Sequence, residues 1–79
     1  MKNNIIPLNM VPIGGFALVR ELIADGSSRR RMLDLGLIQD TEVESLRRSP
    51  SGDPIAYQIR GAVIALRSEE ASKILVEVI

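Results

Sequence analysis

The side chains of this chain that could do chemistry are serines, carboxylates and arginines, because the sequence contains neither histidine nor cysteine. A serine nucleophile needs a nearby base, usually histidine, so we expect Ser27, Ser28 and Ser68 to cap helices instead. Gly14 and Gly15 lack the lysine and the glycine spacing of a phosphate-binding loop, and we predict a turn there. The sequence therefore predicts no catalytic residue and no bound cofactor, and a protein that is not an enzyme.

Two pairs of carboxylates could in principle bind a metal ion. Glu42 and Glu44 are two positions apart on a predicted strand, which places both on one face, and Glu69 and Glu70 begin a predicted helical turn. Transition-metal sites usually include imidazole or thiolate ligands, and this chain has neither. We therefore expect both pairs to be solvated surface charges and predict no metal site.

Three consecutive arginines, Arg29, Arg30 and Arg31, fall in the first turn of a predicted helix. Cations at the start of a helix oppose its dipole, which costs roughly a few tenths of a kcal/mol each. Asp34, or a carboxylate on a neighbouring strand, could compensate these charges as an ordinary structural pair, and we expect this for Arg31. The alternative is functional: an acidic surface on a partner protein, or anionic lipid head groups, would compensate them as well.

Two apolar residues, Leu37 and Ile38, follow this helix directly. Either they complete the core, or they present an apolar edge on which a partner protein docks. An apolar centre with a charged rim is the usual anatomy of a docking surface. We therefore name Arg29, Arg30, Leu37 and Ile38 as the candidate partner-binding residues.

Composition limits the classes of protein to consider. Ten Lys and Arg balance ten Asp and Glu, so the formal net charge is zero, which disfavours nucleic acid as a partner. Hydrophobic residues make up 46% of the 79-residue chain and Phe16 and Tyr57 are the only aromatics, so we expect one domain with an aliphatic core. No apolar run approaches the roughly 20 residues of a membrane span, and the N-terminus lacks the features of a signal peptide. These features predict a soluble, cytoplasmic protein.

Short strands and one helix are expected to position these residues. The helix follows the serine cap at Ser27 and Ser28, runs for about two turns, and ends at Gly36, where a left-handed residue lets Leu37 fold back. Leu22 is expected on the face of its strand opposite the core. The strands are expected at residues 16–23, 42–47, 55–60, 62–66 and 75–79, after an extended lead-in over residues 5–14. The core is expected to include Leu8, Met10, Ala17, Val19, Ile23, Ile55, Tyr57 and Ile59.

This pattern predicts a mainly β fold. Five to six antiparallel strands form a small, strongly bent barrel, with a short helix after the first strand and a helical turn before the last. Barrel closure would protect the strand edges of so small a protein. The alternative is an open sheet with one helix.

Four segments in this order carry a resemblance to a known family: "GGFALV" at residues 14–19, "RRRMLDLGL" at 29–37, "GDPIAYQIRG" at 52–61 and "IALRSEEASKILV" at 64–76. The chain resembles the FeoA family, small cytoplasmic proteins of bacterial ferrous iron transport whose SH3-like fold recurs at the C-terminus of iron-dependent repressors. The resemblance implies a single domain over residues 1–79, with its core at about 8–78. One departure is Asp40, where the family usually has glycine; Asp tolerates left-handed geometry better than most residues, so we expect the turn to survive.

The resemblance also implies a function. It predicts a non-enzymatic accessory or regulatory protein that contacts the cytoplasmic GTP-binding region of the FeoB permease, reaches the membrane only through that partner, and self-associates weakly at most. One alternative is a small nucleic-acid-binding barrel with Arg47, Arg48 and Arg60 along a groove, although stacking aromatics are scarce. Another alternative is a stand-alone metal-sensing regulatory domain.

Overall fold

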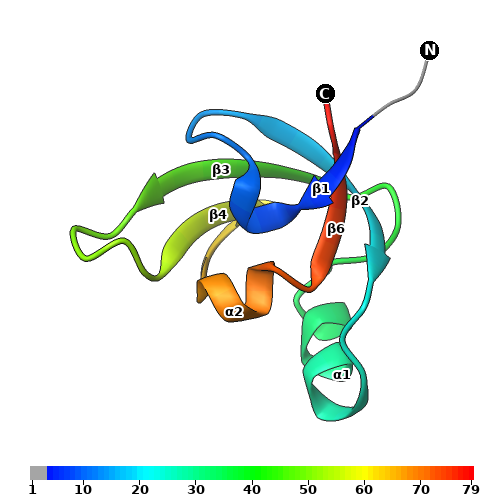
Figure 1. Ribbon diagram of the computed structural model, residues 1–79. Helices are drawn as coiled ribbons and strands as arrows, with labels where there is room; N and C mark the ends of the chain where they lie inside the picture. The colour runs from blue at the N-terminus through cyan, green and yellow to red at the C-terminus, as the bar shows by residue number, and fades with distance from the viewer. Residues whose placement is uncertain (1–3) are drawn as a thin grey trace.

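The computed structural model describes residues 4–79, so the first three residues of the expected domain lie outside the described part. The described chain is mainly β, with α1 after the long strand β2 and α2 before the last strand, as the sequence predicts (Figure 1). The elements are β1 (Ile5–Pro7), the 3₁₀ helix η1 (Leu8–Met10), β2 (Phe16–Leu22), α1 (Gly26–Asp34), β3 (Glu42–Arg48), β4 (Ile55–Ile59), β5 (Ala62–Leu66), α2 (Ser68–Ala71) and β6 (Ile74–Val78).

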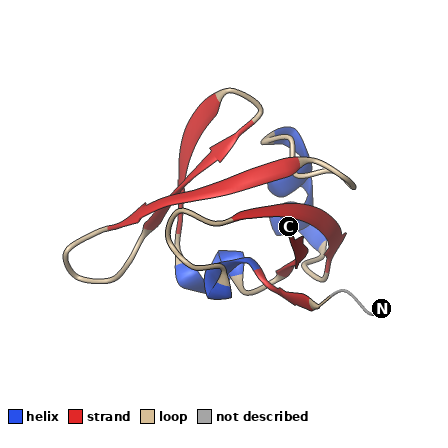
Figure 2. Cartoon of the chain, turned by 90° about the horizontal axis from the view of Figure 1, so that it is seen from above, coloured by secondary structure: helices blue, strands red, loops and turns tan. Residues whose placement is uncertain are grey.

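The six strands form one antiparallel sheet with the order β1-β6-β2-β3-β4-β5. The sheet is strongly bent (Figure 2). The buried core residues lie on one face of it, and the other face is turned outward. Its hydrogen-bonded ladder runs from β1 to β5, and no pairing between these two end strands closes it within residues 4–79. The packed core, rather than a closed ladder, therefore holds the two halves of the bent sheet together.

The hairpin of β4 and β5 follows the predicted alternation. Ile55, Tyr57 and Ile59 are each at most 1% exposed, which confirms their place in the core. Arg60 and Gly61 both have positive φ angles, 50° and 82°, and connect Ile59 to its cross-strand partner Ala62. Two consecutive left-handed residues make the tight two-residue turn whose twist matches that of the strands.

The predicted faces of β2 are wrong toward its C-terminal end. The pairing of β2 with β6 shifts register between Val19 and Glu21, which indicates a bulge at Arg20. An extra residue in one strand reverses the alternation beyond it. Leu22 is consequently buried, whereas Ile23, which we expected in the core, is 55% exposed.

Three further details differ from the sequence expectations. The N-cap of α1 is Asp25, and Ser27 and Ser28 lie inside the first turn instead of capping it. The lead-in forms a short 3₁₀ helix rather than a purely extended segment, which leaves Met10 65% exposed while Leu8 is fully buried as expected. A helical turn points consecutive side chains in different directions, and so the alternation of an extended chain does not apply there.

The N-terminus of α2 is capped from a distance. Ser68 is the first helical residue rather than the cap. Its backbone N–H donates to Asp53 Oδ1 at 2.8 Å, and its hydroxyl donates to the same oxygen at 3.1 Å. The carboxylate that satisfies this helix end therefore comes from the loop before β4, 15 positions earlier in the chain.

Candidate functional site

The end of α1 determines where the candidate apolar residues lie. Gly36 has a φ of 95°, as predicted; its N–H donates to the Leu33 carbonyl at 3.0 Å, and the Leu37 N–H donates to the Met32 carbonyl at 3.1 Å. These two bonds are the Schellman arrangement that turns a chain sharply at a helix end. The turn places Leu37 in the core with no exposure and leaves Ile38 47% exposed. Of the two alternatives for Leu37, the structure supports the core, and Leu37 offers no surface to a partner.

A hollow of about 200 Å³ lies between α1 and β2. Figure 1 shows that α1 projects from the sheet beyond the end of β2. Arg29 and Ile38 line it, together with the core residue Leu37, so three of the four candidate residues meet there, whereas Arg30 does not line it. Leu33, which is 40% exposed, also lines this hollow and was missed as a site residue. The helical period could have indicated its exposure, because consecutive residues of a helix point about 100° apart and Leu33 follows the buried Met32.

The three consecutive arginines have different roles. Arg29 donates a hydrogen bond to the backbone carbonyl of Leu22 at 2.9 Å and so ties the start of α1 to the end of β2. Arg31 forms an ion pair with Glu70 of α2, which confirms a structural pair but places its carboxylate on a helix rather than on Asp34 or a strand. Arg30 is exposed and makes no hydrogen bond or ion pair with any side chain of residues 4–79. Arg30 is therefore the arginine of the three that is most available to a partner.

Asp40 adds a charged link at the position where the resemblance predicts glycine. Its φ of 71° confirms that Asp accepts the left-handed turn. Arg20 bridges Asp40 and Glu77, with a hydrogen bond from its Nε to Glu77 Oε1 at 2.7 Å. The hydrogen bond to Glu77 is the main cause of a raised pKa at the Arg20 guanidinium. The loop after α1 is in this way tied to β2 and β6.

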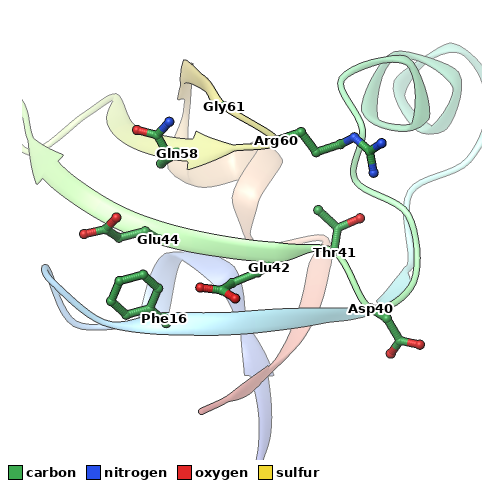
Figure 3. Close-up of a pocket in the computed structure, with 8 residues that line it drawn as sticks. All are labelled: Phe16, Asp40, Thr41, Glu42, Glu44, Gln58, Arg60 and Gly61. Atoms are coloured by element: carbon green, nitrogen blue, oxygen red, sulfur yellow. The ribbon is translucent and has the colours of Figure 1, made fainter.

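A second, larger hollow of about 540 Å³ lies on the outward face of the sheet (Figure 3). Phe16 of β2, Glu44 of β3 and Gln58 of β4 are direct cross-strand neighbours there. Glu42 lies two positions from Glu44 on the same face, as the sequence predicts. We call this surface the sheet hollow; its lining residues are Phe16, Asp40, Thr41, Glu42, Glu44, Gln58, Arg60 and Gly61.

Comparison with known proteins places this geometry in a family. Residues 6–78 match the FeoA domain family. The chain belongs to the FeoA family. It is also 31% identical over 72 residues to a fusion of Fe(2+) transport protein A with the Fe(2+) transporter FeoB from Porphyromonas gingivalis; the match covers 91% of this chain but 8% of that protein. The family is thus associated with ferrous iron transport.

Solved structures confirm the SH3-like fold. The FeoA-like protein of Clostridium acetobutylicum has 38% identity and a TM-score of 0.89, with 100% of this chain and 91% of that chain covered. FeoA of Stenotrophomonas maltophilia, described as an SH3 domain protein and complexed with zinc, has 29% identity and a TM-score of 0.79, with 87% and 86% covered. IdeR of T. acidophilum shares the fold alone, at 14% identity and a TM-score of 0.84, with 100% of this chain and 36% of that chain covered. The predicted resemblance to repressor domains is confirmed at the level of the fold.

No helix within residues 4–79 is long and apolar enough to cross a membrane. Across the same described range, no three or more Asp or Glu side chains are grouped so that they could hold a metal ion.

Proposed function

We propose that this protein is a non-enzymatic, cytoplasmic accessory protein of ferrous iron transport that contacts a FeoB-type permease through its α1 surface. The observation that carries the proposal is the hollow between α1 and β2, where exposed apolar and basic side chains meet. The fused relative supports the choice of partner, because fusion keeps two domains at a high effective concentration. We define the docking face as Arg29, Arg30, Leu33 and Ile38.

The chemistry of the docking face suits a protein partner. Leu33 and Ile38 supply exposed apolar area of the kind that contributes most of the affinity at an interface. Arg29 and Arg30 supply a basic rim that favours acidic groups on the partner and fixes the register of docking. We place the matching surface, an apolar anchor beside acidic side chains, on the cytoplasmic GTP-binding region of the permease.

Binding of the purified GTP-binding region, with and without guanine nucleotide, tests this proposal. Ile38→Asp should weaken binding at least tenfold, because it puts a charge at the apolar centre, whereas Ile5→Asp, at a similarly exposed residue of β1, should leave binding unchanged. Arg30→Glu should weaken binding at low salt and less at high salt, with the exposed Arg47→Glu as its control.

Both docking-face variants should melt at the wild-type temperature, since neither side chain is buried. Wild-type affinity of Ile38→Asp and Arg30→Glu would place the contact elsewhere on the protein. Loss of binding together with loss of folding would be recognised from the melting curve, and Leu33→Ser would then replace Ile38→Asp.

The arginines suggested for a nucleic-acid groove do not gather in one place. Arg47 and Arg48 pair with the first residues of β4, whereas Arg60 follows its last residue, at the opposite end of the hairpin. Arg48 donates to the Gly52 carbonyl in its own loop. The face between these two ends carries the carboxylates of the sheet hollow, which would repel phosphate. No structural observation therefore favours nucleic acid over a protein partner.

A further inference from the structure

The sheet hollow has the chemistry of a cation-binding groove for a peptide. Phe16 is 41% exposed, and the other aromatic residue, Tyr57, is fully buried, so the accessible aromatic ring of the chain borders this hollow. The carboxylates of Glu42 and Glu44 project from the same face as Phe16 (Figure 3). An ammonium or guanidinium group at such a place is attracted by the quadrupole of the aromatic ring and also by the negative charge of the carboxylates.

The two carboxylates are not neutralised from within the described chain. Neither Glu42 nor Glu44 forms an ion pair or side-chain hydrogen bond with any group of residues 4–79. They lie on one strand face two positions apart, which is roughly 7 Å along a strand. Like charges at this distance repel each other weakly, and a bound cation between them would relieve that repulsion.

The cation nearest to the sheet hollow is directed away from it. Arg60 lines the hollow, but its side chain runs toward the turn after α1 (Figure 3). Its Cδ lies so close to Gly36 that a Cβ on that glycine would come within 2.5 Å. Arg20 is engaged by Asp40 and Glu77. The negative potential of Glu42 and Glu44 is therefore left facing solvent inside a concave surface.

We propose that the sheet hollow binds an extended basic segment of a partner protein, with a lysine or arginine side chain over Phe16 and between Glu42 and Glu44. Gln58, the cross-strand neighbour of Glu44, offers an amide to the backbone of that segment. The volume of about 540 Å³ accommodates a few side chains rather than a folded element. This surface goes beyond the α1 docking face and is independent of it.

A second copy of this chain is a weaker candidate for the occupant. Its formal net charge is zero, so two copies have no overall attraction. The exposed cations of a second copy, such as Arg30 of α1 and Arg47 of β3, lie on separate folded elements, so a second copy does not present them along one extended segment. A foreign segment with several adjacent cations would fit the charges better.

Nuclear magnetic resonance titration of the full chain tests the proposal. The probe is a short blocked peptide in which arginine and valine alternate, and the control peptide has glutamate in place of arginine. We expect the basic peptide alone to shift the amide signals of Phe16, Glu42, Glu44 and Gln58. The double variant Glu42→Gln with Glu44→Gln should weaken binding about five- to tenfold, the scale of two partly exposed ion pairs.

Matched variants distinguish binding in the sheet hollow from general attraction of a basic peptide to acidic residues. Asp34→Asn with Glu69→Gln removes the same charge from exposed sites elsewhere and should leave binding unchanged. Phe16→Leu keeps apolar bulk but removes the ring face, and should weaken binding about threefold. Shifts spread over all acidic residues, or equal losses in the two double variants, would overturn the proposal. Self-association by sedimentation that disappears in the Glu42/Glu44 variant would also overturn it, in favour of a second copy.

Discussion

Replacement of Gly36 by alanine should destabilise the protein through two separable effects. The φ of 95° at Gly36 is a left-handed conformation that costs a residue with a Cβ about 1–2 kcal/mol. The new methyl group would also lie 2.5 Å from Arg60 Cδ, so the Arg60 side chain must leave its rotamer, which costs about 1 kcal/mol. Alanine also lowers the conformational entropy of the unfolded chain, which stabilises the folded protein by about 0.4–1 kcal/mol. The net loss of unfolding free energy should be about 1–2.6 kcal/mol.

Gly14 provides the matched control for this change. Its φ is 89°, its N–H is held by the Ser45 carbonyl at 2.7 Å, and a Cβ there would meet no atom within 4 Å. Gly14→Ala therefore carries the same backbone and entropy effects without the contact with Arg60. We expect Gly36→Ala to cost about 1 kcal/mol more than Gly14→Ala in urea denaturation.

The double variant with Arg60→Ala decides whether the difference comes from that contact. Arg60→Ala removes the side chain that the new methyl would meet but keeps a Cβ at position 60. In this background Gly36→Ala and Gly14→Ala should become equally costly. An unchanged difference would show that the Arg60 side chain does not cover Gly36, and would remove one argument for the open charge of the sheet hollow.

Two further predictions concern the core. Burial raises the pKa of Tyr57 from 10.0 to about 12. The unfolded chain therefore loses this proton first, and the free energy of unfolding should be unaffected below pH 10 and fall by about 2 kcal/mol as the pH rises toward 12. The Tyr57 hydroxyl has no hydrogen-bond partner within residues 4–79, so Tyr57→Phe should raise stability at neutral pH by about 1 kcal/mol. The variant should also keep its stability at alkaline pH, because it has no hydroxyl to ionise. Denaturation of the wild type and the variant at several pH values tests this, and an equal alkaline loss in both would refute it. Ile59→Asp should unfold the domain, since a buried unpaired charge costs several kcal/mol of an unfolding free energy of about 5 kcal/mol. The control Ala65→Asp, at an exposed residue, should melt almost normally. A cooperative transition of Ile59→Asp at the wild-type temperature would contradict the place of Ile59 in the core.

Local patterns were sufficient where the deciding contacts lie within a few residues. The alternation of Ile55, Tyr57 and Ile59 predicted a buried strand face, and Gly36 predicted the helix end, because both depend on side-chain period and on φ preference. The left-handed turn at Asp40 was implied by the resemblance instead, because the family usually has glycine at that position. The order of four such segments was also enough to indicate the family.

Tertiary contacts decided the features that local patterns missed. The bulge at Arg20, which exchanges the environments of Leu22 and Ile23, arises from the pairing of β2 with a strand more than 50 positions away. Asp53 caps α2 from another loop, a contact that no capping pattern in the adjacent sequence can reveal.

For the candidate site too, the sequence determined some properties and the tertiary structure decided others. The sequence by itself determined which residues on α1 are basic and which residues after it are apolar, and that Glu42 and Glu44 share one strand face. Only the folded chain decided that Leu37 is buried while Ile38 is exposed, and that Phe16 lies beside the two carboxylates. The physical reason is that exposure and cross-strand neighbours depend on how distant segments pack, whereas charge, polarity and period are properties of each segment alone.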